Sequence, residues 1–352
     1  MPALSRYFIF LLLIFFTLAS CRQHTAPVPV QRAFYYWKSD ANYFDSSEVK
    51  AVHTLGVKTL FVKFFEVEYD AAMGAMPVAK TEIYPPNTYD SLWPRDINII
   101  PVVFIQTEVL QKTPAGDIDS LAANILFLVR KRFARQFDHE KHGFNEIQVD
   151  CDWTASTKEA YFHLLTALKK QYGKKISCTL RLYPYKYPDK MGVPPVDRAM
   201  LMCYNLISPT GSNQDNSILS TGELKKYLGR KTVYPLPLDI ALPVNSWVLC
   251  FHNKRLEGVI HEPDDISSFA NPVNALWYQV KKDTLLGDVY LREGDEIKYE
   301  KITPAQLMEV TRLLSDKLTI RAGTTVSFFH LDKHILTQYS HETLDRIYNN
   351  FR

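Results

Sequence analysis

The stretch Glu146–Thr154 reads Glu-Ile-Gln-Val-Asp-Cys-Asp-Trp-Thr and decides the fold. Its residues alternate between two faces, as side chains do along a β-strand. One face is apolar, and the other carries Gln148, Asp150 and Asp152. A carboxylate is costly to bury unless it is paired or hydrogen-bonded. We therefore expect a buried strand that ends in carboxylates with a defined role.

Seven further segments have the length and composition of buried strands. They are rich in Val, Ile, Phe and Leu, as parallel strands covered on both faces are. Helical stretches separate most of them, including Asp117–Phe137 and a helix that a capping box of Ser156 and Glu159 would begin. The alternation predicts an α/β fold, a (β/α)8 TIM-type barrel. The expected strands are Ala33–Trp37, Val57–Phe65, Asn98–Gln106, Glu146–Trp153, Lys175–Tyr183, Ala199–Asn205, Leu238–Pro243 and Thr324–Asp332.

Residues 244–302 interrupt the alternation between the seventh and eighth strands. We expect antiparallel strands there, with a hairpin over Leu285–Lys298 that turns at Glu293-Gly294-Asp295. We interpret this region as an insertion on a single barrel domain of residues 32–352. The link Pro184–Arg198 contains four prolines, so we expect no full helix between the fifth and sixth strands.

The first residues have the pattern of an export signal. The apolar run Phe8–Ala19 has 12 residues, too few for an ordinary membrane-spanning helix but suited to a signal peptide over residues 1–20. It ends Leu-Ala-Ser-Cys, which resembles a bacterial lipobox in which Cys21 is acylated. Residues 21–31 would then be a tether. The alternative is an ordinary signal peptide followed by a coincidental cysteine.

A lipid on Cys21 would hold the protein on a membrane of the cell envelope. Arg22 is not the aspartate that retains lipoproteins at the inner membrane, and no acidic run follows Cys21. We therefore expect the periplasmic face of the outer membrane.

Composition and motifs exclude several other classes of protein. The net charge is only +3 and no basic stripe is present, so a nucleic-acid partner is not expected. There is no zinc motif, phosphate loop or nucleotide-binding glycine pattern, so no metal or other cofactor is expected. The remaining cysteines have no disulfide or metal spacing and are expected to be buried small hydrophobic residues: Cys151, Cys178, Cys203 and Cys250. The oligomeric state stays open.

Barrel active sites lie at the carboxyl ends of the strands, where this chain has many polar residues. The candidate catalytic residues are Asp150, Asp152, Tyr204 and Asp332. The candidate substrate-binding residues are Trp37, Glu66, Gln148, Trp153, Arg181, Tyr183 and Asn205. The aromatic residues among them could stack on sugar rings.

Each candidate also has an ordinary structural interpretation. Asp150 could simply bond Arg181 inside the barrel, and Trp153 could be a core residue. His330 could satisfy a backbone group rather than act as a base. Glu66 and Glu68 could be loop charges in water.

The fourth-strand pattern resembles that of family 18 glycoside hydrolases, the chitinase-like barrels. Their strand reads Asp-Gly-x-Asp-x-Asp-x-Glu, and the last Glu is the general acid. Asn145, Gln148, Asp150 and Asp152 fall on the four acidic positions of that pattern. The sequence also resembles a family of bacterial lipoproteins, of unknown substrate, that share Asp-x-Asp-Trp-Thr and Tyr-Asn.

Two further segments are similar to the chitinase-like family. Met202-Cys203-Tyr204-Asn205 resembles its sixth-strand Met-x-Tyr-Asp, and Ala241-Leu242-Pro243 lies where that family has a Gly-Leu-Pro-like run. The insertion after the seventh strand matches in position. The resemblance implies an oligosaccharide or polysaccharide partner and a membrane-anchored glycoside hydrolase that uses carboxylates at strand ends.

The resemblance makes Asp152 the general acid, kept protonated by burial and by the charge of Asp150. Asp332 or Glu66 would be the second carboxylate. Aspartate is one methylene shorter than glutamate, so the acid would sit ~1.5 Å further back, and a displacement near 1 Å can cost about a hundredfold in rate. The amides at Asn145, Gln148 and Asn205 replace carboxylates of the family. The alternative is therefore a non-catalytic carbohydrate-binding or envelope-scaffold protein.

Overall fold

The computed structural model describes most of the chain after the expected signal peptide. The described residues are 29–39, 41–84, 92–94, 96–137, 143–210, 215–229, 233–261 and 265–351. Cys21, the predicted signal peptide and most of the predicted tether lie outside them. Within these ranges no helix is both long enough and apolar enough to cross a membrane.

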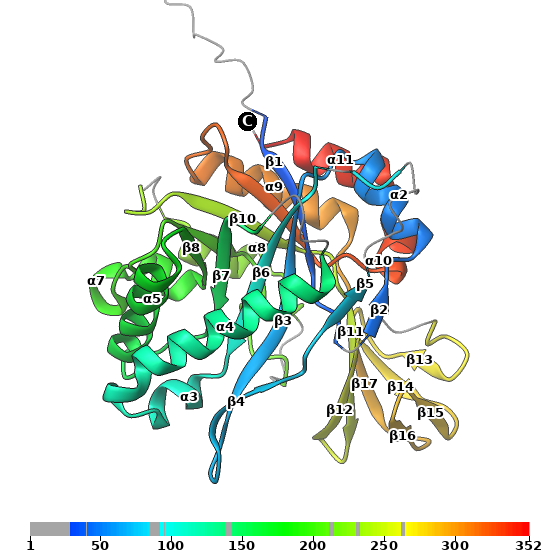
Figure 1. Ribbon diagram of the computed structural model, residues 1–352. Coiled ribbons are helices and arrows are strands. Elements are labelled where there is room, and N and C mark those ends of the chain that lie inside the picture. The colour runs from blue at the N-terminus through cyan, green and yellow to red at the C-terminus, as the bar shows by residue number, and fades with distance from the viewer. Residues whose placement is uncertain are drawn as a thin grey trace, which may run out of the picture.

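Eight parallel strands close into a barrel, as predicted (Figure 1). Each strand pairs with the next along the chain, and β1 pairs with both β18 and β3, which closes the ring. All eight observed strands overlap the predicted ones. They are β1 (Gln31–Tyr36), β3 (Thr59–Asp70), β6 (Asn98–Ile105), β7 (Glu146–Asp150), β8 (Lys175–Leu180), β9 (Arg198–Met202), β10 (Leu238–Pro243) and β18 (Thr325–Phe329).

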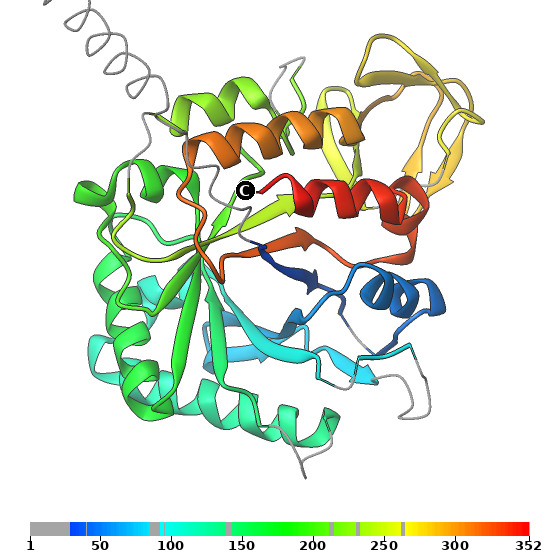
Figure 2. The ribbon, with the colours of Figure 1, turned by 90° about the horizontal axis from the view of Figure 1, so that it is seen from above.

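Helices lie around the outside of the strands (Figure 2). The link between β8 and β9 holds only two short helices, α6 and α7, as its prolines predict. The helices are α2 (Ser46–Thr54), α3 (Thr107–Lys112), α4 (Ile118–Gln136), α5 (Lys158–Tyr172), α6 (Leu182–Lys186), α7 (Pro188–Met191), α8 (Thr221–Tyr227), α9 (Pro304–Lys317), α10 (Lys333–Gln338) and α11 (His341–Asn349), with a 3-10 turn, η1 (Ala115–Asp117).

The predicted capping box of α5 is wrong. The helix begins at Lys158 after Thr157, whose hydroxyl bonds the preceding turn at Thr154 instead of the first helical N–H groups. Ser156 contacts the Thr154 hydroxyl as well. The short hydroxyl side chains thus stabilise the tight turn between β7 and α5 rather than the helix itself.

The predicted insertion is present and forms an antiparallel sheet in the order β12-β11-β17-β14-β13. The predicted hairpin turn is wrong, because β15 and β16 turn at Gly287, and Glu293-Gly294 only joins β16 to β17. The strands are β11 (Trp247–His252), β12 (Arg255–His261), β13 (Ala270–Pro272), β14 (Trp277–Val280), β15 (Thr284–Leu286), β16 (Val289–Leu291) and β17 (Glu296–Glu300).

The insertion extends from the end of the barrel at which the strands finish (Figure 1). The long β3 continues at the same end into a hairpin with β4 (Gly74–Val78). A small parallel pair, β2 (Ala41–Tyr43) with β5 (Glu82–Tyr84), lies between them. These elements surround the end of the barrel that is expected to carry the site.

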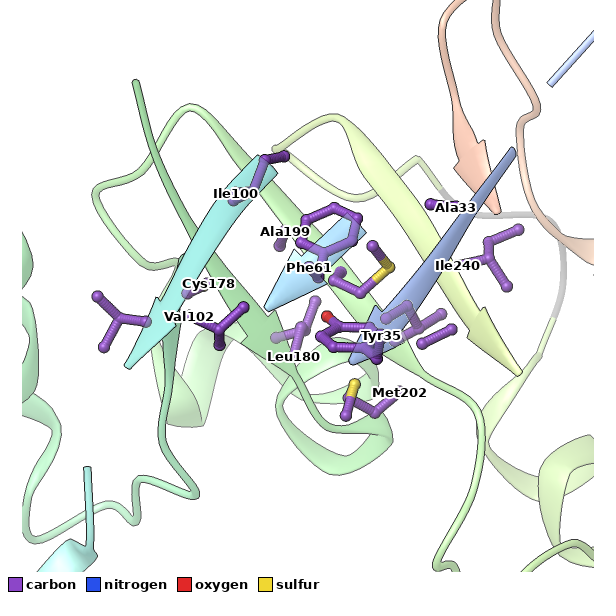
Figure 3. Packing of buried hydrophobic residues seen from close by; sticks show 14 of the residues in the cluster. Ala33, Tyr35, Phe61, Ile100, Val102, Cys178, Leu180, Ala199, Met202 and Ile240 are labelled. Carbon is purple, nitrogen blue, oxygen red and sulfur yellow. The ribbon is translucent and has the colours of Figure 1, made fainter. Parts of the chain in front are cut away.

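The described residues form a large hydrophobic core for the barrel and its helices and a small one inside the insertion. The cysteines at 151, 178, 203 and 250 are buried, as predicted, and none of them is in a disulfide. Figure 3 shows the barrel packing around Ala33, Tyr35, Phe61, Ile100, Val102, Cys178, Leu180, Ala199, Met202 and Ile240.

At the opposite end of the barrel, where the strands begin, ion pairs and hydrogen bonds join neighbouring strands. Arg198 at the start of β9 bonds both oxygens of Glu146 at 2.9 Å and Asp239 at 2.7 Å. Asp239 in turn accepts the Thr325 N–H at 2.7 Å, which ties β10 to β18. Four strands of the barrel therefore meet in one hydrogen-bonded network.

Replacing Arg198 with methionine is expected to lower the free energy of unfolding by about 3–5 kcal/mol, because it leaves two buried carboxylates without their cation. Urea denaturation measures the change. Lys58→Met is the matched control, since Lys58 and Asp96 form an ion pair with side chains 60% and 72% exposed. That control is expected to cost at most about 1 kcal/mol. Equal losses in the two variants would contradict a stabilising role of the network.

Candidate functional site

The polar face of β7 lines the barrel interior and rises to the mouth. Gln148 is buried and accepts the Tyr35 hydroxyl at 2.6 Å. Asp150 is mostly buried and accepts the Thr179 hydroxyl of β8 at 2.6 Å. Asp152 follows the strand, with 54% of its side chain exposed. Gln148 is thus part of the barrel's internal bonding, and only the last of the three side chains opens to solvent.

Asp150 and Asp152 have different partners, and both partners come from β8 or the residue that follows it. Arg181 Nε lies 2.9 Å from Asp152 Oδ1, whereas Asp150 bonds Thr179. The interpretation of Asp150 as the partner of Arg181 is therefore wrong. The reason is the register: Val149 pairs with Cys178, which sets Thr179 level with Asp150 and Arg181 level with Asp152.

The burial expected at Asp152 is found at Asp150 instead. Burial is the main reason that the pKa of Asp150 rises to about 6; the Thr179 hydrogen bond opposes the rise and the charge of Asp152 adds to it. Asp150 thus carries a proton over part of the mildly acidic range. Asp152 is exposed and sits in an ion pair with Arg181, so it lacks the burial that was expected of it.

Tyr204 and Asn205 follow β9 and reach the same region. Tyr204 is 3% exposed, and its ring lies 5.4 Å from that of Phe329. Burial and the nearby Asp150 raise the pKa of Tyr204, so its hydroxyl keeps its proton. Asn205 is exposed and has a left-handed backbone with φ 54°, a conformation that asparagine tolerates well. Its N–H donates to Ile218 O at 2.8 Å.

The three candidate aromatic residues have different environments. Trp37 is half-buried beside Phe329 at 5.8 Å. Tyr183 is 46% exposed and has a partly free ring. Trp153 is 4% exposed and stacks on Tyr161 of α5 at 5.1 Å. The predicted sugar-stacking role of Trp153 is therefore wrong, and its interpretation as a core residue holds.

A β-bulge in β3 aims charged residues into the barrel mouth. The register of β3 with β6 shifts between Lys63 and Phe65, as a bulge does when it redirects a side chain. Lys63 is buried, and its Nζ lies 2.6 Å from Glu66 Oε1 and 2.9 Å from Ser39 Oγ. Glu66 is 20% exposed, so it is a bound ion-pair partner rather than a loop charge in water. Its charge acts on Asp150 as well.

Glu68, the second acidic residue beyond the bulge, is also bound. Gln106 at the end of β6 donates to Glu68 Oε1 at 2.6 Å. The interpretation of Glu68 as a loop charge in water is therefore wrong as well.

Asp332 lies beyond β18 and is tied down by protein partners. It caps α10 by accepting the His334 N–H at 2.8 Å, and Lys38 lies 3.2 Å from its other oxygen. Lys38 also contacts the fully buried Glu48 at 2.5 Å. Burial works to raise the pKa of Asp332, but the His334 N–H and Lys38 together lower it below its usual value. Asp332 is thus a structural carboxylate in this conformation rather than a free second acid.

His330 precedes this cluster and is neutral at neutral pH. Burial lowers its pKa to about 4, although Asp332 and the Leu331 backbone favour the charged form. The His330 Nδ1 atom is buried without a hydrogen-bond partner, so the expectation that it satisfies a backbone group stays a prediction.

The described cavities lie away from these residues. One of about 410 Å³ lies between the β3–β4 hairpin and α4, and another of about 420 Å³ lies within the insertion around His252 and Asp295. None of the predicted site residues lines either of them. Among the described residues no group of three or more His, Cys, Asp or Glu side chains could hold a metal ion. The candidate site is therefore defined by its side chains at the barrel mouth.

Several residues of the mouth were missed from the sequence. Thr179 was detectable, because Ser177, Thr179 and Arg181 repeat the two-residue polar alternation of β7. Lys63 was detectable as the single charge within Thr59–Phe65. Lys38 and Glu48 had no such signal, because their pairing depends on elements distant in the sequence.

Together, the closed barrel, the carboxylates that end β7 and the insertion after β10 define a barrel of the chitinase-like class in fold. No protein-family model matches the sequence, and no curated protein matches it. Solved structures do. The spore cortex-lytic enzyme SleL of Bacillus cereus is 14% identical over 93% of this chain and 75% of that chain, with a TM-score of 0.53.

Two further structures have the same fold. SleL of Bacillus megaterium is 14% identical over 93% of this chain and 76% of that chain, with a TM-score of 0.52. The chitinase of Chromobacterium violaceum is 13% identical over 89% of this chain and 98% of that chain, with a TM-score of 0.50. The resemblance to chitinase-like barrels is thereby confirmed for the fold.

Proposed function

We propose that this protein acts on a glycan at the mouth of its barrel, as a glycoside hydrolase whose proton chemistry rests on Asp150 and Asp152. The observation that carries the proposal is the pairing of a buried carboxyl, with a pKa of about 6, and an exposed carboxylate two residues further on. Glycoside cleavage needs a carboxyl group that reaches substrate and gives a proton to the leaving oxygen. Asp152 supplies that reach.

The roles follow from the surroundings of each group. Asp150 is the buried proton carrier, because it is protonated at mildly acidic pH and lies behind Asp152. Asp152 faces the glycan and, once Arg181 has turned away from it, gives the proton to the leaving oxygen as the glycosidic C–O bond breaks; water adds to the sugar carbon and its remaining proton returns to the carboxylate pair. The guanidinium is 36% exposed, so a bound sugar can draw it from the carboxylate to its own hydroxyl groups. Asn205 binds the sugar beside them, Trp37 and Tyr183 offer ring faces, and the buried Tyr204 packs beneath the site with its hydroxyl donated to Met202 Sδ.

The ion pair between Arg181 and Asp152 also favours a second function. If Arg181 stays in place, Asp152 keeps its ion-pair partner and the mouth binds glycan without cleaving it. This is the carbohydrate-binding alternative, on the same surface and with the same ligand class.

A glycan panel separates the two functions. The structures with this fold include enzymes described as cortex-lytic and as chitinases, so the panel holds chitin oligosaccharides and purified peptidoglycan sacculi. Release of new reducing ends between pH 4 and 7 supports the hydrolase. Binding by calorimetry without release supports the binding protein. If the panel shows no release of reducing ends and no binding, both functions are contradicted.

We further propose that a lipid on Cys21 holds the protein on the periplasmic face of the outer membrane. The lipobox-like Leu-Ala-Ser-Cys and the proline-containing tether support this placement. Cys21→Ser is expected to abolish labelling by radioactive palmitate and to move the protein from the membrane fraction to the soluble one. Cys178→Ser is the control. Retained labelling, or digestion of the wild type by protease added to intact cells, would contradict the placement.

A further inference from the structure

A fully buried ion pair lies at the root of the insertion, where the chain enters and leaves it. Lys298 and Glu300 of β17 are 1% and 0% exposed, and their charged atoms lie 2.7 Å apart. Glu300 also accepts the Trp247 indole N–H at 2.6 Å. Trp247 begins β11 and stands opposite Glu300 in the sheet register. The pair therefore joins the first and last strands of the insertion.

The same pair binds a segment of the barrel. Glu300 accepts both the backbone N–H of Ser217, at 2.9 Å, and the Ser217 hydroxyl. Lys298 Nζ donates to Asp215 O at 3.3 Å. Asn216 adds a bond from its side chain to Lys301 O at 2.8 Å. These residues belong to the link between β9 and α8, not to the insertion.

That link is bonded to the candidate site. Ile218 O accepts the Asn205 N–H at 2.8 Å, and Ser217 O accepts the Leu206 N–H at 3.2 Å. Asn205 has a left-handed backbone directly after Tyr204. A continuous series of hydrogen bonds therefore runs from Glu300 in the insertion to Asn205 at the barrel mouth.

We infer that the Lys298–Glu300 pair is a positioning device that holds Tyr204 and Asn205 in place for the glycan, so that the insertion governs affinity at the barrel mouth. A buried ion pair seldom adds net stability over an apolar pair of the same volume. Its charged oxygens do provide acceptors for three donors from two separate segments, which an apolar pair cannot do. The inference rests on the glycan function proposed above and deepens it.

A double variant separates positioning from stability. In the full chain, Lys298→Met alone leaves Glu300 buried without its cation and is expected to lower the melting temperature strongly. Lys298→Met with Glu300→Leu removes both charges and is expected to recover most of that loss. The double variant still lacks the bonds to Ser217 and Trp247. Its Asn205 amide is expected to exchange with solvent about tenfold faster, and its affinity for chitopentaose to fall by about the same factor.

Asp295→Asn is the matched control. Asp295 is another buried carboxylate of the insertion, and it pairs with His252 at 2.6 Å within the insertion itself. It is expected to reduce stability while leaving the exchange of the Asn205 amide and chitopentaose affinity unchanged. A stable double variant with wild-type exchange and affinity would overturn the inference, because the pair would then be structural only.

The glycan proposal and this inference can fail separately. If the wild type binds neither chitopentaose nor sacculi, the proposed function fails. The inference is then tested by two measurements that need no glycan, the titration of Asp150 and the exchange of the Asn205 amide. The carboxyl carbon of Asp150, followed by NMR, reports whether the mouth has rearranged. An unchanged Asp150 titration together with unchanged Asn205 exchange in the double variant would overturn the inference; changes in both would support it.

Discussion

Asp152→Asn is expected to lower the rate of glycan hydrolysis by about a hundredfold to ten-thousandfold, the range for loss of a group that transfers the proton. Asparagine has nearly the shape of aspartate and can still accept a bond from Arg181. It cannot carry and release a proton. Glycan binding is therefore expected to survive the change, so kcat falls much more than KM rises.

The measurement is the release of reducing ends from whichever panel glycan the wild type cleaves. Asp316→Asn serves as the control, since this carboxylate lies on α9 and is 73% exposed. Full activity in Asp152→Asn would remove Asp152 from the mechanism. An equal loss in Asp316→Asn would show that the assay reports on stability or yield rather than on the site.

Asp150→Asn is expected to remove a pH dependence from the stability of the fold. An unperturbed aspartate has a pKa of 3.8, which we take for the unfolded chain. In the folded protein burial raises the pKa of Asp150 to about 6. Between these values the folded state binds more protons than the unfolded state, so stability falls as pH rises. The loss begins near pH 4, is complete above about pH 6, and amounts to about 3 kcal/mol in the wild type.

Urea denaturation at pH 4, 5, 6 and 7 measures this slope. Other buried groups add to the slope of the wild type, among them Asp239, whose pKa is raised to about 6 mainly by burial, and Glu48, whose pKa burial also raises. The difference between wild type and Asp150→Asn isolates the contribution of Asp150. Parallel curves for the two proteins would show that Asp150 is ionised in the same way in the folded and unfolded states.

The sequence predicted the barrel well because the fold depends on local periodicity. The apolar runs of all eight strands and the proline-rich break between β8 and β9 are visible without knowledge of tertiary contacts. The burial of Trp153 could also have been predicted from this periodicity. The period of two places it on the same face as Val149 and Cys151, which is the face that packs against the helices.

The partners of the site residues could not be predicted in the same way. Which residue of β8 stands beside Asp152 depends on the register between two strands, and packing of the whole sheet sets that register. The bulge in β3 turns Lys63 inward and so neutralises Glu66, an effect with no local sequence signal. The turn before α5 was misassigned because hydroxyl side chains suit turns and helix caps equally well.

The charge network around Arg198 has a consequence for how this barrel tolerates change. Glu146 in that network and Asp150 at the mouth are four positions apart on β7, a distance of about 13 Å along a strand. Free-energy changes at sites so far apart are expected to be close to additive. Substitutions at the mouth therefore leave the Arg198 network unchanged. The site can be redesigned without losing the stability that this network provides at the other end of the barrel.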